Sequence, residues 1–242
     1  MTPDWTDDAD SLFSAAHFRA LAAPHVLGDA VANFARPHFG DYAWQVQLGA
    51  IIASGQRTGR VKPKPAALDS GVPFRDAAVL VGVVDRGAEA SIILTQRTAH
   101  LNDHAGQISL PGGKIDPGDA DPIAAALREA EEEIGLDRSF VEPIGYFFPY
   151  LTGTHFRIVP VLATIRPGFT LSPNSDEVAE VFEVPIRFLM DDANHSIGQR
   201  VFDGKMRYFY EMPFGGYHIW GITAGIIRQI FELLYGHSGE LE

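Results

Sequence analysis

The residues of this chain best suited to chemistry are the glutamates and the arginine of the run Arg128-Glu129-Ala130-Glu131-Glu132-Glu133. On an α-helix each residue turns by about 100°, so Glu129, Glu132 and Glu133 fall within one arc roughly 100° wide. Carboxylates crowded on one face repel each other unless a cation lies between them, and Mg²⁺ prefers oxygen ligands of this kind. The spacing therefore predicts a site for a hard divalent cation on this helix.

An acidic helical run is usually only a solvated face, but two features of the neighbouring sequence argue against that interpretation here. Apolar residues form a stripe along the same helix, at Ala124, Ala125, Ala126, Leu127, Ala130 and Ile134. The helix is therefore expected to pack against other elements, which fixes the direction of its acidic face. Gly112 and Gly113 precede the helix, and glycine allows the backbone to approach a ligand or ion closely because no Cβ intervenes.

This stretch resembles the Nudix box, whose pattern is G-x5-E-x7-R-E-U-x-E-E-x-G-U with U aliphatic. Residues 128–136 fit the second half of the pattern at every fixed position, with Ala130 as the small apolar U. The first half departs from the pattern: Asp119 stands where Glu is usual, and one additional residue separates it from Arg128. The resemblance implies a hydrolase that uses Mg²⁺ or Mn²⁺ to cleave the diphosphate of a nucleoside diphosphate linked to another group.

A second match precedes the box. Residues 94–113 resemble the signature of the coenzyme A pyrophosphatase branch, roughly L-L-T-x-R-S-x-x-L-R-x-H-x-G-Q-I-S-F-P-G-G. The agreeing positions are Leu94, Thr95, Arg97, Leu101, His104, Gly106, Gln107, Ile108 and Ser109. Asn102 replaces an Arg that could pair bidentately with a phosphate, so this chain lacks one cation of the signature. Residues 173–185 and 219–224 also resemble segments of the same branch.

The resemblance implies a set of metal ligands and catalytic groups. Glu129, Glu132 and Glu133 would be the metal ligands, and the carbonyl oxygen of Gly113 would add another. Glu132 and Glu133 would also be catalytic residues, together with Arg128. Arg128 would orient Glu132, which lies four residues further along the helix.

The general base is left open between two glutamates outside the box. Nudix enzymes use a glutamate either inside or outside the box, and Glu177 is the first candidate here, with Glu180 the second. Glu180 and Glu183 are equally expected as solvent-facing positions of an alternating strand.

Candidate substrate contacts lie beside the glycine pair, at Arg97, His104, Gln107 and Gly112. A lone histidine is more often a structural hydrogen-bonding group than a catalyst. An arginine at a strand end is nearly as often paired with a carboxylate as with a substrate phosphate. Tyr217 and Trp220 are expected in packing at the start of the last helix, with adenine stacking as the alternative.

The acidic helix needs a scaffold, and the flanking sequence predicts one. Residues 77–84 form an apolar β-branched run, and residues 91–97 follow a glycine-containing turn, so the pair predicts a hairpin. A helix over 122–134 begins after Asp121, with Pro122 at its first position, and ends at Gly135. Further strands are expected near 143–150, 155–166, 178–184, 198–203 and 206–212, with a helical turn at Pro185 and a helix over 221–235. These elements predict an α+β fold, a mixed β-sheet sandwiched between helices (α/β/α), and the Nudix resemblance implies the same fold.

The N-terminal part carries no motif. Residues 9–36 favour helix, interrupted at Pro24, and residues 55–76 indicate a connector rich in Gly, Pro, Lys and Arg. We therefore divide the chain into an N-terminal helical extension and linker, 1–72, and a Nudix hydrolase domain, 73–242. The helices of the extension are expected either to pack on the domain or to form a homodimer.

The amino-acid composition excludes several classes of binding partner. The formal net charge of −12 argues against a nucleic-acid groove, which needs clustered Lys and Arg. The absence of cysteine excludes disulfide scaffolds and thiol nucleophiles. The first residues are acidic and lack an apolar segment, and residues 77–84 are too short to span a membrane. We expect a cytoplasmic protein whose partner is a small nucleotide substrate, with no membrane or nucleic acid.

The substrate is open among three possibilities. Coenzyme A and its derivatives come first, cleaved to 3′,5′-ADP and 4′-phosphopantetheine. ADP-ribose, a dinucleotide polyphosphate or a nucleoside triphosphate is the alternative that Asn102 makes plausible. A Nudix fold that binds a nucleotide metabolite as a sensor, without hydrolysis, is the third, although a sensor need not retain the glutamates of the box.

Overall fold

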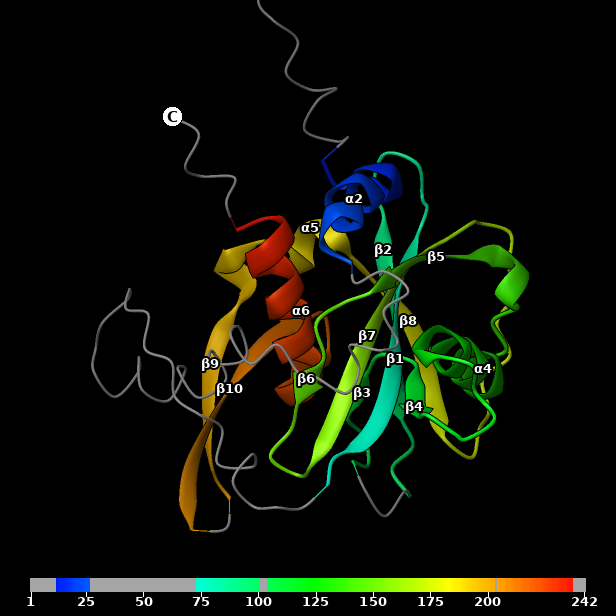
Figure 1. The fold of residues 1–242 in the computed structure, drawn as a ribbon. Coiled ribbons are helices and arrows are strands. Elements are labelled where there is room, and N and C mark those ends of the chain that lie inside the picture. The colour runs from blue at the N-terminus through cyan, green and yellow to red at the C-terminus, as the bar shows by residue number, and fades with distance from the viewer. Residues whose placement is uncertain (1–11, 27–72, 101–103, 203, 237–242) are drawn as a thin grey trace, which may run out of the picture.

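The computed structural model describes residues 12–26, 73–100, 104–202 and 204–236 of the chain (Figure 1). Two sheets and the helices that cover them make up the described part, which confirms the predicted α+β sandwich. The strands are β1 (Arg75–Val84), β2 (Ser91–Arg97), β3 (Ile108–Ser109), β4 (Gly112–Lys114), β5 (Val141–Tyr146), β6 (Tyr150–Leu151), β7 (Phe156–Ile165), β8 (Val178–Pro185), β9 (Ser196–Phe202), β10 (Lys205–Phe214) and β11 (Tyr217–Trp220). The helices are α2 (Ala15–Ala22), α4 (Pro122–Ile134), α5 (Ile186–Leu189) and α6 (Gly221–Leu234), with short 3-10 turns at Ala23–His25, Arg138–Phe140 and Asp192–Asn194.

The main sheet is mixed and is built around β1. β1 and β2 form the predicted antiparallel hairpin, and β1 pairs in parallel with β7 along its whole length. The order of the central strands is β3-β2-β1-β7-β5, with β4 also on β1, β6 on β7 and β8 on β2. A strand inside a sheet covered on both faces must be apolar on both sides, which explains the uninterrupted apolar run of β1.

Helices cover the two faces of the main sheet (Figure 1). α4 packs its alanine-rich stripe and Ile134 on one face, in a core that includes Leu80 and Val159. α6 packs Ile226, Ile227 and Ile230 on the other face. These two cores hold α4 in a fixed orientation, so its acidic side has a defined direction.

The sequence signals at both ends of α4 act as predicted. The Asp121 side chain caps the helix by accepting a hydrogen bond from the Ala124 N–H at 2.7 Å, and Pro122 occupies the first position. Gly135 follows the helix with φ of 67°, the left-handed conformation that glycine adopts without strain. The helix therefore runs from residue 122 to residue 134, as expected.

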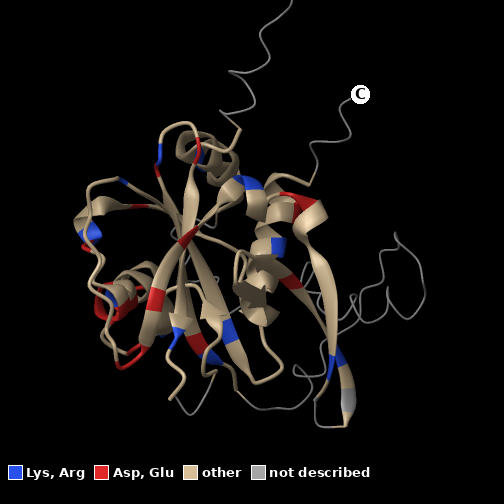
Figure 2. Ribbon diagram, turned by 180° about the vertical axis from the view of Figure 1, so that it is seen from behind, with Lys and Arg blue, Asp and Glu red and all other residues tan. Residues whose placement is uncertain are grey.

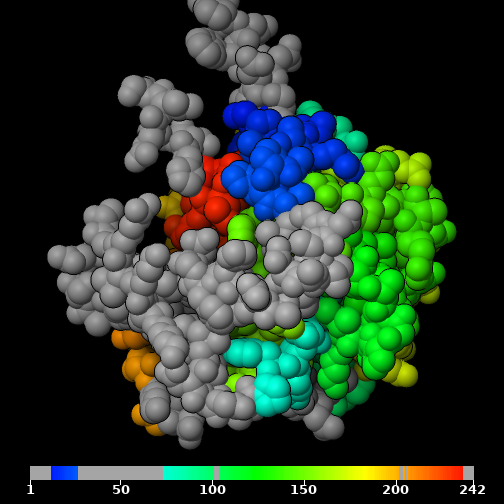
Figure 3. All heavy atoms as spheres, in the orientation of Figure 1, coloured from blue at the N-terminus to red at the C-terminus, as the bar shows by residue number. Residues whose placement is uncertain are grey.

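The described part of the N-terminal region packs on the main sheet. Phe18 and Ala22 of α2 are fully buried in the same core as α6, and the ring of Phe13 stacks on Tyr235 with the centroids 6.1 Å apart. Figure 3 shows α2 in blue beside the red end of α6. The helix ends before Pro24, as predicted. The rest of the expected helix 9–36 and most of the connector lie outside the described residues, and the division at residue 72 stays a prediction.

The strands differ from the expected ones in two places. The strand expected at 143–150 is divided into β5 and β6, with a bulge between Pro143 and Gly145 in the pairing with β7. The two strands expected near 198–203 and 206–212 are β9 and β10, and β11 extends them into a separate sheet of order β11-β10-β9. Within the part of the chain that the structure describes, no helix is long and apolar enough to cross a membrane.

Candidate active site

The Gly112–Gly113 pair and the acidic face of α4 meet directly. β4 pairs with β1, with Gly113 opposite Ala78, and the Gly112 N–H donates a hydrogen bond to Glu133 Oε2 at 3.0 Å. A Cβ on Gly113 would lie 2.6 Å from both carboxylate oxygens of Glu129, closer than any real contact. Gly112 has φ of 150°, which other residues rarely adopt. A Cβ on Gly112 would lie 2.3 Å from the Ala78 carbonyl oxygen, so Gly112 is needed for β4 to pair with β1, while a Cβ on Gly113 would displace the Glu129 carboxylate.

Arg128 connects four acidic residues of the loop and the helix. Its Nε and Nη2 donate to the two carboxylate oxygens of Asp119, each at 3.0 Å. Its Nη1 donates to Glu129 at 3.1 Å and to Glu132 at 3.0 Å, and Nη2 also lies 3.7 Å from Asp116. Arg128 therefore contacts Glu132, and its orienting role stays a prediction. The additional residue between Asp119 and Arg128 does not prevent their contact. The hydrogen bonds from Arg128 lower the pKa of the Asp119 carboxyl group.

Glu133 is the most buried carboxylate of the site. Its exposure is only 4%, and burial raises its pKa to about 7, with the charges of Glu129 and Glu177 adding to the rise. The Gly112 N–H and the guanidinium of Arg97, 3.6 Å away, oppose the rise. Arg97 thus pairs with a carboxylate, one of its two expected roles. Its Nε is buried and has no hydrogen-bond partner among the described residues.

Glu177 approaches this cluster because its loop is attached to the end of α4. The Asn174 N–H donates to the Glu133 carbonyl at 2.9 Å, and the Thr98 N–H donates to the Glu177 carbonyl at 2.9 Å. Burial raises the pKa of Glu129, and the negative charges of Glu132 and Glu177 raise it further against the effect of Arg128. Glu129, Glu133 and Glu177 therefore repel one another in a partly buried space. Figure 2 shows acidic residues gathered on α4.

The fit of a divalent cation to these residues can be tested on this arrangement. Oxygen donors, mutual repulsion and the close approach of Glu129 to the Gly113 backbone all suit a hard cation. Among the described residues, however, no three acidic or histidine side chains already surround one point as metal ligands would. Arg128 engages Glu129 and Glu132 instead. The chemistry of the donor groups fits a divalent cation, and in this structure the carboxylates of Glu129 and Glu132 are paired with Arg128.

The other two glutamates of the β8 region have different partners. Glu180 accepts a hydrogen bond from the Tyr217 hydroxyl at 2.7 Å. Glu183 lies further along β8 and pairs with Arg86, whose Nε donates at 3.1 Å. Burial alone would raise the pKa of Glu183, but hydrogen bonds from Arg86 and Ser91 outweigh it and lower the pKa.

His104 and Gln107 lie in one tight turn beside Arg97. His104 Nδ1 and Gln107 Oε1 are 2.9 Å apart, and the Gln107 N–H donates to the His104 carbonyl at 3.1 Å. The Arg97 N–H donates to the Gln107 carbonyl at 2.9 Å, which attaches the turn to the end of β2. The structure therefore brings these three candidate substrate contacts together. Asn102 lies outside the described residues.

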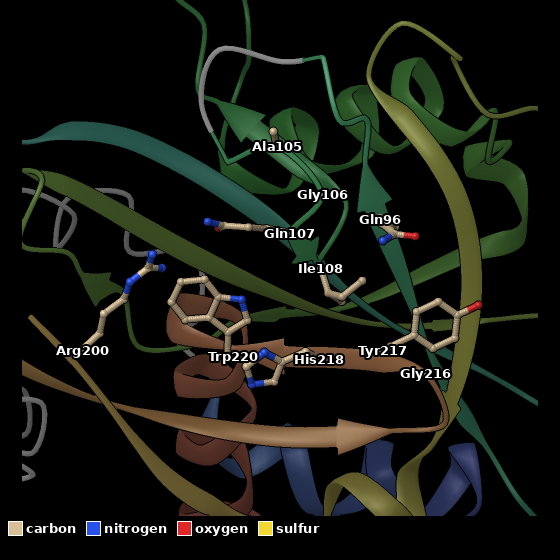
Figure 4. A pocket seen from close by; sticks show the side chains of 10 residues that line it. All are labelled: Gln96, Ala105, Gly106, Gln107, Ile108, Arg200, Gly216, Tyr217, His218 and Trp220. Atoms are coloured by element: carbon tan, nitrogen blue, oxygen red, sulfur yellow. The ribbon is translucent and has the colours of Figure 1, made fainter. Parts of the chain in front are cut away.

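An open pocket of about 380 Å³ lies between this turn and the second sheet (Figure 4). Its lining is polar and aromatic, and consists of Gln96, Ala105, Gly106, Gln107, Ile108, Arg200, Gly216, Tyr217, His218 and Trp220. Sequence analysis singled out neither Arg200 nor His218 as a site residue. The signal that could have found them is Gly215-Gly216, because two glycines between β-favouring runs indicate a hairpin and so predict β11.

The Tyr217 and Trp220 side chains both pack and line this pocket. The Tyr217 ring stacks on Phe182 with the centroids 3.7 Å apart, which agrees with the expected packing role. The centroid of the Trp220 ring is 5.0 Å from that of Phe209 and 6.0 Å from that of His218. Their position in the lining keeps the alternative of base stacking open.

Comparisons with known proteins place this site in a family context. Residues 73–203 match the family model for the NUDIX domain. A Nudix hydrolase called NudL from Citrobacter koseri, described as uncharacterized, is 41% identical over 156 residues, covering 64% of this chain and 81% of that protein. The protein of the same name from Escherichia coli K12 is 40% identical over the same shares of the two chains.

Solved structures resemble the chain more distantly. A Caenorhabditis elegans Ap4A hydrolase in a binary complex is 20% identical with a TM-score of 0.39, covering 46% of this chain and 80% of that one. A Nudix hydrolase from Alicyclobacillus acidocaldarius is 15% identical with a TM-score of 0.43, covering 67% of this chain and 93% of that one.

Proposed function

Because this chain belongs to the Nudix hydrolase family, we propose that it cleaves the diphosphate of coenzyme A or its derivatives, releasing 3′,5′-ADP and 4′-phosphopantetheine. Family membership supports the coarser activity, pyrophosphohydrolysis of a nucleotide-derived substrate. The preference for coenzyme A rests on the signature of residues 94–113 and on the segments at 173–185 and 219–224.

One observation of the structure carries the proposal. The carboxylates of Glu129 and Glu133 converge on the Gly112–Gly113 backbone, within the electrostatic reach of Glu177 and next to Arg97. Burial and mutual repulsion make this cluster costly unless it binds something cationic. Such a cluster beside an arginine donor suits the binding of a diphosphate together with a divalent cation.

The cation, Mg²⁺ or Mn²⁺, would be held by Glu129, Glu132, Glu133 and the carbonyl oxygen of Gly113. When bound, it supplies positive charge against the diphosphate oxygens, which otherwise repel a nucleophile. Arg128 is a positioning residue in this proposal, since it contacts Asp119, Glu129 and Glu132 and orients the ligand set.

The remaining roles fall to residues of the chain around the cluster. Glu177 accepts a proton from the attacking water, whose oxygen forms a bond to one phosphorus. The bond between that phosphorus and the bridging oxygen breaks, and the leaving phosphate keeps the bridging oxygen. Arg97, whose guanidinium lies 3.6 Å from Glu133, supplies positive charge next to the diphosphate. His104, Gln107 and the Gly112 backbone contact the substrate beside it.

A hydrolysis screen with and without Mg²⁺ tests the proposal, using coenzyme A, acyl-coenzyme A, ADP-ribose and dinucleotide polyphosphates. Chromatography of the products should show 3′,5′-ADP from coenzyme A. Cleavage of ADP-ribose or a dinucleotide polyphosphate in preference to coenzyme A would replace the proposed substrate and keep the reaction. Tight binding of a nucleotide with no turnover under any metal would favour a sensor.

A further inference from the structure

The pocket of Figure 4 is separate from the carboxylate cluster but touches the same strand end. Gln96 lines the pocket, and the next residue, Arg97, contacts Glu133. The pairing of β2 with β8 shifts register between these two residues, so the end of β2 carries one side chain to the pocket and the next to the cluster. A substrate whose diphosphate lies at the cluster can therefore place the group on one side of that diphosphate in the pocket.

Two arginines lie opposite each other on one face of the second sheet, Arg200 in the pocket lining and Arg207 beside it, with Arg207 Nη1 near Gly153. Arg200 of β9 lines the pocket and is paired in register with Arg207 of β10, so both side chains are on the same face of the sheet. Neither forms an ion pair with the residues that the structure describes. Like charges directly opposite each other destabilise a strand pair. An anion bound between the guanidinium groups would remove that repulsion.

An aromatic platform lies next to these arginines. Trp220 lines the pocket beside Arg200, as Figure 4 shows, with Gln107 across from it. The Glu211 carboxylate of the same sheet lies 3.0 Å from His218 Nε2, and among the described residues it forms no ion pair with either arginine. An indole beside two guanidinium groups suits a ligand that combines a flat ring with a phosphate.

We propose that this pocket binds a nucleoside that carries a monophosphate on its sugar in addition to the diphosphate. The base stacks on Trp220, the amide of Gln107 meets the edge of the base, and the sugar phosphate lies between Arg200 and Arg207. This inference rests on the proposed function, because coenzyme A carries such a phosphate at the 3′ position of its ribose. Arg200 and Arg207 would then supply the positive charge that the signature loses where Asn102 replaces an arginine.

Calorimetric binding of 3′,5′-ADP and AMP to the full chain tests the pocket without turnover. The two nucleotides differ only in the 3′-phosphate, and we expect 3′,5′-ADP to bind at least about tenfold more tightly, as a charge-assisted contact implies. Arg200→Gln should remove this difference. Arg187→Gln removes an exposed guanidinium of α5 that pairs with Glu89, so it changes the net charge equally and should retain the difference.

Stacking is tested with two changes at Trp220. Trp220→Ala should weaken the binding of both nucleotides at least about fivefold, since base stacking on an aromatic side chain is worth roughly 1–3 kcal/mol. Trp220→Phe keeps a ring in the packing against Phe209 and should recover much of the affinity, which separates lost stacking from misfolding.

The pocket and the proposed substrate can fail independently. Equal affinities of 3′,5′-ADP and AMP for the wild-type chain, or an affinity ratio unchanged by Arg200→Gln, would overturn the pocket assignment even if coenzyme A is hydrolysed. A ratio that depends on Arg200, with no hydrolysis of coenzyme A, would leave the pocket in place and remove the proposed substrate. Comparing coenzyme A with dephospho-coenzyme A should show the effect of Arg200→Gln in KM rather than kcat.

Discussion

Arg128 and Asp119 are joined by two parallel hydrogen bonds, each 3.0 Å long, between the helix and the loop that precedes it. The same guanidinium reaches Glu129 and Glu132, so Asp119 determines where Arg128 can hold the two carboxylates. The shorter Asp side chain and the additional residue in the loop thus compensate for each other. The departure from the Nudix pattern at this position leaves the ion pair intact.

Asp119→Asn is therefore expected to lower kcat by about tenfold, roughly 1.4 kcal/mol of transition-state stabilisation, through misplacement of Glu129 and Glu132. Steady-state kinetics should place the loss in kcat more than in KM. Asp85→Asn is a control, because Asp85 caps a surface turn at Gly87 and has no contact with the site. An unchanged kcat for Asp119→Asn would show that Arg128 is positioned without its aspartate.

Glu132→Gln is expected to reduce turnover by at least about 10²-fold if a divalent cation is bound by this carboxylate. Removal of the cation with a chelator should abolish turnover, and added Mg²⁺ should restore it. Glu131→Gln is the matched control on the adjacent residue, since Glu131 points away and pairs with Arg138 at 2.6 Å. Equal turnover for the two variants would contradict the assignment of Glu132 as a ligand.

Gly113→Ala tests the close approach of β4 and α4. The added Cβ would lie 2.6 Å from the Glu129 carboxylate oxygens, so we expect a loss of activity with a smaller loss of thermal stability. Gly118→Ala is the control, because a Cβ at Gly118 has no atom within 4 Å. Calorimetry and kinetics on both variants would separate a local displacement of Glu129 from unfolding. Full activity in Gly113→Ala would show that Glu129 can move without consequence.

Local signals in the sequence account well for α4 and its site. Asp121, Pro122 and Gly135 define the helix ends by their own backbone chemistry, and the apolar stripe sets the face that packs. The approach of Glu177 could be suggested only by resemblance, because it depends on a loop docked through Asn174 to the Glu133 carbonyl. The Arg200 pocket depends on the packing of β11 beside the 104–107 turn, between segments about a hundred residues apart, which no local pattern encodes.

We expect the free energy of unfolding to decrease at acidic pH because of the buried His195. Burial lowers its pKa below the usual value, and the nearby charge of Arg228 lowers it further, although the Leu189 carbonyl and Asp191 and Asp192 oppose this. Because the folded pKa is depressed, the stabilisation is complete above the unfolded pKa of about 6.5 and is lost as pH falls through the folded pKa.

The thermal midpoint between pH 8 and pH 5 measures this effect of His195. His195→Gln, which cannot take up a proton, should show a smaller decline toward acidic pH than the wild-type chain. His218→Gln removes an exposed histidine and should decline as the wild type does. An identical pH dependence for wild type and His195→Gln would show that other groups control acid stability.

The choice between Glu177 and Glu180 as general base rests on their different surroundings. Glu177 raises the pKa values of both Glu129 and Glu133, whereas Glu180 is bonded to the Tyr217 hydroxyl at 2.7 Å on the pocket side. If Glu177 accepts the proton of water, Glu177→Gln should lower kcat by about 10²–10⁴-fold with little change in KM. Glu180→Gln is the matched change three residues later, on β8. It should leave kcat within about threefold of wild type, because it affects only the exposed hydrogen bond from the Tyr217 hydroxyl. The reverse result, a large loss in Glu180→Gln alone, would move the base to β8 and require the Tyr217 hydrogen bond to open during turnover.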